Sequence, residues 1–314
     1  MDRQRPGRKL RLLALLAVLA ALAAFGLKAR LARHPRAPAG FPRTPEEFLP
    51  AEKREAEAAR LELRLKENPD DLHALVQMGL IQFQRGRDHY IDGINALEEA
   101  RNLGALEVRV PFYLGAMYQE LGLVPFAIAE YQRFLRNSPE DRDVRLRLAK
   151  LEYQEGRYAE AAKEYENLYA EKTEDPLVRE NLALSLMGAG RPHEARFHFE
   201  GLSQANGETA RRAHFFLGKL ASQNREYPLA ATHLEKARSG GGPVPGVDAK
   251  ELYLQLAQTY DKLKLAEKSR PAWEQVLALD PGNKEAKTQL RKAAKASRIR
   301  HSRGDAGRLF RPQT

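Results

Sequence analysis

The 314-residue chain contains no cysteine, which excludes disulfides, thiolate metal sites and cysteine nucleophiles together. Its eight histidines are scattered, and the closest two, His193 and His198, are five residues apart. That spacing puts them on different faces of a helix, unlike the four-residue spacing of a zinc-binding HExxH motif. The sequence also lacks a Gly-x-Ser-x-Gly motif, and its carboxylates stand at exposed helical spacings beside Lys or Arg. We therefore expect no catalytic site, no metal, no cofactor and no small-molecule substrate.

The two ends of the chain carry a net positive charge, whereas the middle does not. The formal net charge is +10, but residues 1–40 carry nine Lys or Arg against one Asp, and residues 284–314 carry ten against two acidic residues. The central part is therefore net acidic, so the basic composition does not indicate a nucleic-acid-binding face there. Binding of RNA or anionic lipid through the basic C-terminal tail remains an alternative, and a solvated, disordered tail is the simpler interpretation.

One long apolar run is present, residues 12–27, preceded by five basic residues. At about 1.5 Å per residue, this run spans roughly 24 Å, slightly less than the ~30 Å hydrocarbon core of a bilayer. We interpret it as an uncleaved signal anchor with the N-terminus in the cytoplasm and the remainder outside it. A cleaved signal peptide is the first alternative, because Ala21-Leu22-Ala23 has the form of a cleavage site. A buried helix of a soluble protein is the third interpretation.

The rest of the chain repeats a pattern with a period of about 34 residues. A small residue that follows a Leu or Met recurs at spacings of 36, 34, 34, 35 and 39, as Gly79, Gly115, Ala149, Ala183, Gly218 and Ala257. We call these six the ruler residues. Seven residues after the ruler comes glycine in four units, at Gly86, Gly122, Gly156 and Gly190. Arg225 and Lys264 occupy this place in the other two, so we expect those two turns to be atypical.

Each unit continues with a second small residue and, four positions later, a large one. The small residues are Gly93, Ala127, Ala161, Ala195, Ala230 and Ser269, and the large ones are Leu97, Tyr131, Tyr165, Phe199, Leu234 and Trp273. Small residues let two helices approach closely, and large ones fill the gap to the next unit, so we assign Trp273 to the core. The order and spacing resemble the tetratricopeptide repeat. This resemblance implies an all-α, right-handed superhelical solenoid of about six helix–turn–helix repeats, here with an N-terminal transmembrane helix.

The predicted organisation has five parts. They are the basic N-terminus and anchor (residues 1–33), a Pro-rich linker acting as a stiff spacer (34–45), a capping helix or half-repeat (46–70), six repeats (71–282) and a C-terminal solvating helix with a basic tail (283–314). Within the repeats, the Gly- and Pro-rich residues 239–246 predict a flexible linker that lets the sixth repeat hinge. Leu61 and Pro69 take the large and closing places of the half-repeat, but its small place falls on Glu57, between Ala56 and Ala58.

The resemblance implies a concave groove, lined by the first helices, that binds partner proteins. Its expected lining stands three residues before, one after and four after each ruler residue: Val76, Leu80, Phe83, Phe112, Gln119, Leu146, Lys150, Tyr153, Leu184, Met187, Phe215, Lys219 and Leu254. We expect Phe83, Phe112, Tyr153 and Met187 to be the most exposed. The alternative is that many of these side chains pack between adjacent first helices.

The sequence thus predicts a non-catalytic, single-pass membrane-anchored scaffold whose groove takes a helix or an extended apolar segment of a partner protein. The alternative is a soluble exported adaptor released by signal-peptide cleavage. No nucleic-acid partner is expected for the repeats.

Overall fold

The computed structural model describes residues 40–171, 175–240 and 242–295. Within these ranges the regular structure is helical, without strands. Residues up to Leu151 belong to one compact unit and residues from Glu152 onward to a second. We call them unit 1 and unit 2, and each has its own apolar core. The predicted all-α repeat fold is confirmed, whereas the right-handed superhelix stays a prediction.

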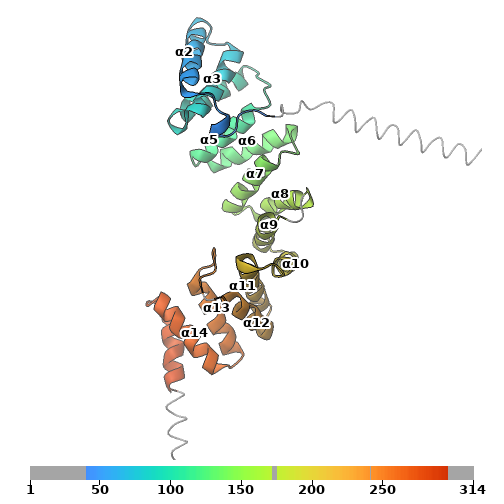
Figure 1. Cartoon of the computed structure of the whole chain (residues 1–314), viewed down its shortest axis with the longest axis vertical. Coiled ribbons are helices and arrows are strands. Elements are labelled where there is room, and N and C mark those ends of the chain that lie inside the picture. Colours follow the sequence, from blue (N-terminus) through green and yellow to red (C-terminus); the bar gives the residue numbers. More distant parts are fainter. Residues whose placement is uncertain (1–39, 172–174, 241, 296–314) are drawn as a thin grey trace, which may run out of the picture. The chain divides into compact units, whose positions relative to one another are not determined.

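Unit 1 is a series of helices in which neighbours along the chain pack on one another (Figure 1). A short 3-10 helix, η1, comes first, and a second, η2, separates α3 from α4. The elements are η1 (Pro45–Glu47), α2 (Ala51–Glu67), α3 (Leu72–Arg85), η2 (Arg87–His89), α4 (Tyr90–Asn102), α5 (Val110–Glu120), α6 (Val124–Asn137) and α7 (Arg142–Gln154), which contains the boundary between the units.

Unit 2 continues the same alternation, with α9 packed on α8 and α10, α11 on α12, and α13 on α14. Its helices are α8 (Tyr158–Glu171), α9 (Pro176–Gly188), α10 (Pro192–Leu202), α11 (Gly207–Gln223), α12 (Tyr227–Arg238), α13 (Ala249–Lys262) and α14 (Ala266–Leu279).

The small and large residues of the repeat pattern meet as expected. All twelve small residues are buried, and the six large ones, Trp273 included, are at most 1% exposed. A Cβ atom added to Gly79 would lie 2.3 Å from Leu97, and one added to Gly115 would lie 2.8 Å from the ring of Tyr131. A Cβ atom added to Gly218 would lie 2.6 Å from Leu234. The ruler position is therefore small because the large residue of the same repeat packs directly against its backbone.

Arg225 and Lys264 form the same turn as the glycines they replace, so the prediction of two atypical turns is wrong. The four turn glycines have φ between +73° and +103°, and Arg225 and Lys264 have φ of +63° and +58°. Among the described residues, they are the only two non-glycine residues with positive φ. The helix–turn–helix geometry requires this left-handed residue, and the surrounding packing compensates for the strain of a side chain there.

The predicted capping helix is α2, which packs on α3. It begins after Pro50, whose missing N–H suits a helix start. Leu61 is 1% exposed and Ala58 is 2% exposed, and both contact Ala74, Met78 and Ile81. Ala58 is thus the small residue of the half-repeat, although the repeat spacing placed that position at Glu57.

The Gly- and Pro-rich segment at residues 239–246 contacts the rest of unit 2 through two of its carbonyl oxygens and through Val244. The guanidinium of Arg211 donates hydrogen bonds to the carbonyl oxygens of Ala237, Gly242 and Pro243. Val244 is 3% exposed and belongs to the core that contains Trp273. The hinge stays a prediction; the structure adds that an arginine holds two carbonyl oxygens of this segment, which a flexible linker would leave to water.

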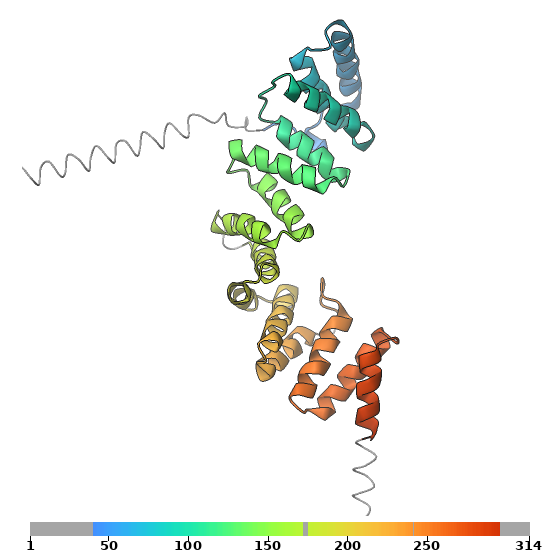
Figure 2. The same cartoon turned by 180° about the vertical axis from the view of Figure 1, so that it is seen from behind.

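A further helix at residues 284–295 follows α14 and covers it (Figure 2). Ala286 is fully buried in the core of unit 2, and Leu290 packs against that core. Most of its remaining residues are exposed, as expected of a terminal helix with a polar outer face.

Among the described residues, no helix is long and apolar enough to cross a membrane. The predicted anchor at residues 12–27 and the basic tail beyond residue 295 lie outside the described residues.

Candidate functional site

The predicted groove residues of unit 1 lie on its first helices, α3, α5 and α7, but the largest of them are not exposed. Phe83 is 7% exposed and Phe112 only 1% exposed, so the prediction that these two rings are accessible is wrong. Val76 and Leu80 are also buried, Gln119 and Leu146 are half-buried, and Lys150 is exposed.

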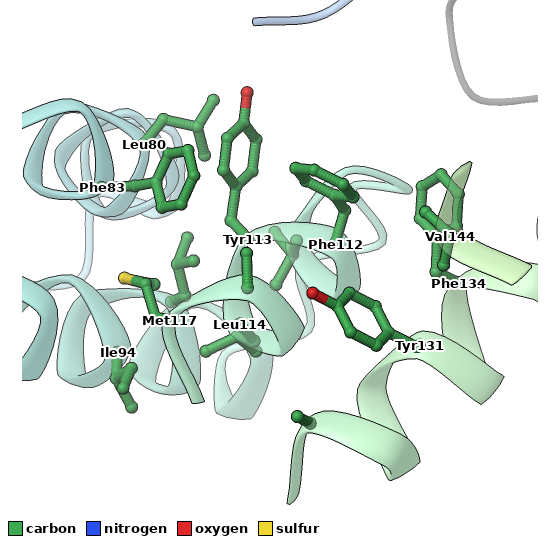
Figure 3. Close-up of a cluster of buried hydrophobic side chains, with 14 of the residues drawn as sticks. Leu80, Phe83, Ile94, Phe112, Tyr113, Leu114, Met117, Tyr131, Phe134 and Val144 are labelled. Carbon is green, nitrogen blue, oxygen red and sulfur yellow. The ribbon is translucent and has the colours of Figure 1, made fainter. Parts of the chain in front are cut away.

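A stretch of the chain itself, which includes the short helix η1, covers this face. We call residues 41–49 the strap, since they cross α3, α5 and α6 before α2 begins. Phe41 is 4% exposed, and its ring centroid lies 5.0 Å from that of Phe112, 5.7 Å from Tyr113 and 6.1 Å from Phe134. Figure 3 shows Phe83, Tyr113, Phe112 and Phe134 side by side, forming the wall that the strap meets. The strap therefore occupies the place that the sequence assigned to a partner.

Arg43 fixes the strap by charge as well as by ring contacts. Its Nη1 and Nη2 donate to the two carboxylate oxygens of Asp141 at 3.0 and 2.6 Å, and Asp143 lies 3.9 Å away. The guanidinium carbon also lies 4.2 Å from the ring centroid of Phe41 and 4.9 Å from that of Phe112. A paired carboxylate and stacked rings together recognise arginine better than lysine, because only guanidinium is planar and bidentate.

The acceptor for Arg43 is positioned independently of the strap. Asp141 precedes α7, and its Oδ1 accepts the backbone N–H of Val144 at 3.1 Å, as an N-cap does. The carboxylate is thereby oriented by its own helix.

Two further hydrogen bonds hold the strap backbone. The hydroxyl of Tyr113 donates to the carbonyl oxygen of Pro42 at 2.9 Å, and the side-chain oxygen of Gln84 accepts the N–H of Leu49 at 3.0 Å. Burial raises the pKa of Tyr113 to about 12, so this phenol keeps its donor proton at physiological pH. At the end of the strap, Phe48 packs edge-on against Phe83 at 5.6 Å.

A cleft of about 620 Å³ remains open beside the strap. Leu80, Ile81 and Tyr113 form its apolar side, and Pro42 and Leu49 of the strap border it. Basic and acidic side chains complete the lining, namely Lys53, Glu57, Arg60 and Arg109. Leu80 is the one predicted groove residue that lines this cleft.

In unit 2 the predicted groove residues are only partly covered. Tyr153, Leu184, Met187 and Leu254 are half-buried, whereas Phe215 is 2% exposed. The Tyr153 ring packs against Tyr158 with centroids 5.3 Å apart. Tyr153 and Met187 are therefore half-buried like Leu184 and Leu254, and their role in binding a partner stays a prediction.

Ion pairs between consecutive first helices occupy other positions of this face. Arg212 of α11 donates twice to Glu180 of α9, both at 2.8 Å, and Lys219 of α11 contacts Glu251 of α13 at 2.7 Å. Lys219 was expected in the groove lining, and its ammonium is already paired within the unit. At these positions the alternative interpretation, packing between first helices, describes the structure better.

The described residues contain one close pair of histidines. No group of three or more His, Asp or Glu side chains is placed to hold a metal ion in this part of the chain. The closest histidines are His214 and His233, whose Nδ1 atoms are 3.0 Å apart. Burial, the neighbouring imidazole and Lys236 lower the pKa of His214 to about 4, so the pair is neutral at pH 7.

Sequence reasoning missed the strap residues Phe41, Arg43 and Phe48 and the acceptor Asp141. A signal was present, because Phe41 is a bulky aromatic residue inside the segment 34–45, which composition alone assigned to a stiff spacer. Phe48 lies just after it, in the predicted capping half-repeat.

Comparison with known families identifies the repeats. Residues 118–176 and 152–220 match two models of the tetratricopeptide repeat family. No curated protein sequence matches the chain.

Solved structures with a similar fold, in contrast, are found in large number. One is the complex of Naa15 and Naa10 bound to HypK-THB, with a TM-score of 0.56 and 18% identity over 77% of this chain. This chain spans only 37% of that one. Another is the C-terminal part of a tetratricopeptide repeat protein from Cytophaga hutchinsonii, with a TM-score of 0.53, 19% identity, and coverage of 76% of this chain and 96% of that one. At these identities the likeness concerns the fold alone. The family matches and the fold agree with the repeat pattern, and the chain carries tetratricopeptide repeats.

Proposed function

We propose that the chain is a non-catalytic tetratricopeptide scaffold that binds segments of partner proteins through the faces of its first helices. The observation that supports the proposal is the strap, because this face holds a segment of the chain itself. Rings from α3, α5 and α6, a carboxylate and two hydrogen-bonding side chains together hold an extended polypeptide there. Extended or helical segments in grooves are the usual ligands of such surfaces.

The half-buried first-helix residues of unit 2 supply a second part of the proposed surface. Tyr153, Leu184, Met187 and Leu254 can gain contacts from a partner, since none is fully covered within the unit. Apolar and aromatic residues of this kind are the usual energetic centres of an interface.

We also propose that residues 12–27 anchor the chain in a membrane as a single-pass helix, with the repeats on the extracytoplasmic side. The support is the length and apolar character of this run and the basic residues that flank it. The soluble exported adaptor, with a mature chain beginning at Ala24, is the alternative.

Site-specific photocross-linking in cells tests the binding face. A photoreactive phenylalanine replaces Met187 on α9, and the matched control replaces Phe197 on the second helix α10, where the native ring is 64% exposed. We expect discrete cross-linked partners from position 187 and none of these from position 197. Identical product patterns from the two positions would contradict binding by the first helices.

Fractionation tests the anchor separately. Membranes from cells expressing the full chain are washed with high salt and alkaline carbonate, and the N-terminus of the retained protein is sequenced. Retention of a chain that includes residues 12–27 is expected. A carbonate-soluble chain starting at Ala24 would instead establish the exported adaptor.

A further inference from the structure

We propose that the face of unit 1 covered by the strap is a recognition site for partner segments with an aromatic residue followed two positions later by arginine, and that the strap is its competing internal ligand. This deepens the proposed function, on which it rests for the biological role. The internal ligand carries Phe41-Pro42-Arg43, and its contacts define what the site reads.

The first element of recognition is a socket for an aromatic side chain. Phe112 meets Phe41 edge-on at 5.0 Å, and Tyr113 and Phe134 complete the contact. Offset and edge-on aromatic pairs contribute beyond their buried area. An aliphatic side chain would fill the socket only partly and would give up these ring contacts.

The second element is an arginine socket next to it. Asp141 faces the guanidinium with both carboxylate oxygens, Asp143 adds negative charge, and the rings of Phe41 and Phe112 stack on it. Asp141 keeps its orientation without the strap, since the N–H of Val144 holds it. Arginine two positions after the aromatic residue therefore meets a carboxylate that is already aligned.

The third element reads the backbone between the two side chains. The Tyr113 hydroxyl donates to the carbonyl of Pro42, a bond that any residue at that position can accept. Proline there fixes φ and so restricts the backbone between the two flanking side chains. The site thus specifies two side chains and one carbonyl.

The groove cannot stand empty without cost, because removing the strap would expose Phe83, Phe112 and Phe134 and leave the Tyr113 hydroxyl and Asp141 without these partners. The strap is joined directly to α2, so its effective concentration at the site is on the order of millimolar. A partner segment gains access to the site by matching the strap's contacts and adding others, and the neighbouring cleft of about 620 Å³ leaves room for them.

Fluorescence anisotropy on the full chain tests the proposal. The probe is a fluorescent peptide with the sequence of residues 40–49, titrated into the wild-type chain and into a Phe41→Ala/Arg43→Ala variant, which weakens the strap but keeps every wall residue. We expect the variant to bind the peptide at least tenfold more tightly than the wild-type chain does. A peptide with alanine in place of the arginine, or the same variant carrying Asp141→Asn, should lose tenfold or more.

Tight binding that ignores both the peptide's arginine and Asp141 would overturn the proposed specificity. Absence of binding to a variant whose far-UV circular dichroism and cooperative unfolding match wild type would overturn the site itself. If the variant fails to fold, hydrogen exchange of the wild-type chain tests the proposal instead. A saturating concentration of isotope-labelled peptide should displace the strap and so speed exchange of the amides in residues 41–49. An unchanged exchange rate refutes displacement.

One outcome assigns another role to this face. A wild-type chain that cross-links as a dimer through an exchanged strap would identify a second copy as the occupant and overturn the proposal of a separate partner. Failure of the cellular cross-linking or membrane tests would leave this result intact, because the peptide assay uses only purified chain. The two proposals therefore fail separately.

Discussion

Replacing Phe41 by alanine measures how far the strap is part of the core of unit 1. The ring is 4% exposed and contacts three other aromatic rings. Burying a phenylalanine side chain contributes about 1.5–3 kcal/mol, and an aromatic pair adds about 0.5–1.5 kcal/mol. We therefore expect the free energy of unfolding of unit 1 to fall by about 3 kcal/mol.

The matched control is Phe126→Ala on α6, because Phe126 is 59% exposed. Its expected loss is within about 0.5 kcal/mol, as is usual for surface positions. Urea denaturation followed by circular dichroism gives the stability, and hydrogen exchange of the α5 amides localises the effect to the helix beneath Phe41. If Phe41→Ala costs no more than Phe126→Ala and leaves α5 protection unchanged, the strap is a loosely attached segment and the reasoning fails.

Three further perturbations test the fold. In thermal unfolding, Gly115→Ala should lower stability by about 1–3 kcal/mol through overpacking. Its control, Gly242→Ala, should be neutral, because the added Cβ meets no atom within 4 Å. Equal effects of the two substitutions would contradict close packing at the ruler position. His214 has a lowered pKa, so its neutral form stabilises the fold fully above pH 6.5, and stability is lost as pH falls from 6.5 toward about 4. Allowing for solvent screening, we expect a loss of about 1 kcal/mol that His214→Gln reduces, and an unchanged pH profile would refute this origin. Arg225→Gly should raise stability by up to about 1 kcal/mol by relieving positive φ, and a lower melting temperature would show that the side chain contributes more than its backbone strain costs.

The sequence pattern predicted the repeat core because its determinants are local. Gly115 and Tyr131 are 16 residues apart and belong to two helices joined by a short turn, so a fixed spacing was enough to pair them. The prediction of atypical turns at Arg225 and Lys264 failed for the opposite reason. Residue type indicates only a preference for positive φ, whereas the packed helices on either side impose the conformation.

The strap could not be predicted in the same way, because its partners are remote in sequence. Pro42 and Tyr113 are 71 residues apart, and Arg43 and Asp141 are 98 apart. No periodicity links such pairs, and proline-rich composition is typical of a solvated spacer. The predicted groove residues do lie on the first helices, but what covers each of them depends on these long-range contacts.

The strap and the segment at residues 239–246 share a physical cause. A helical repeat leaves apolar side chains on the face of its first helices, and burying them is favourable whatever chain covers them. Proline- and glycine-rich segments suit this role because they lie extended and offer free backbone carbonyls, which Tyr113 binds at Pro42 and Arg211 binds at Gly242 and Pro243. The same two properties characterise an extended partner segment. The proposed partner segment would use the same side-chain sockets and single carbonyl contacts, so its competition with the strap would be decided by effective concentration and by how well its side chains match.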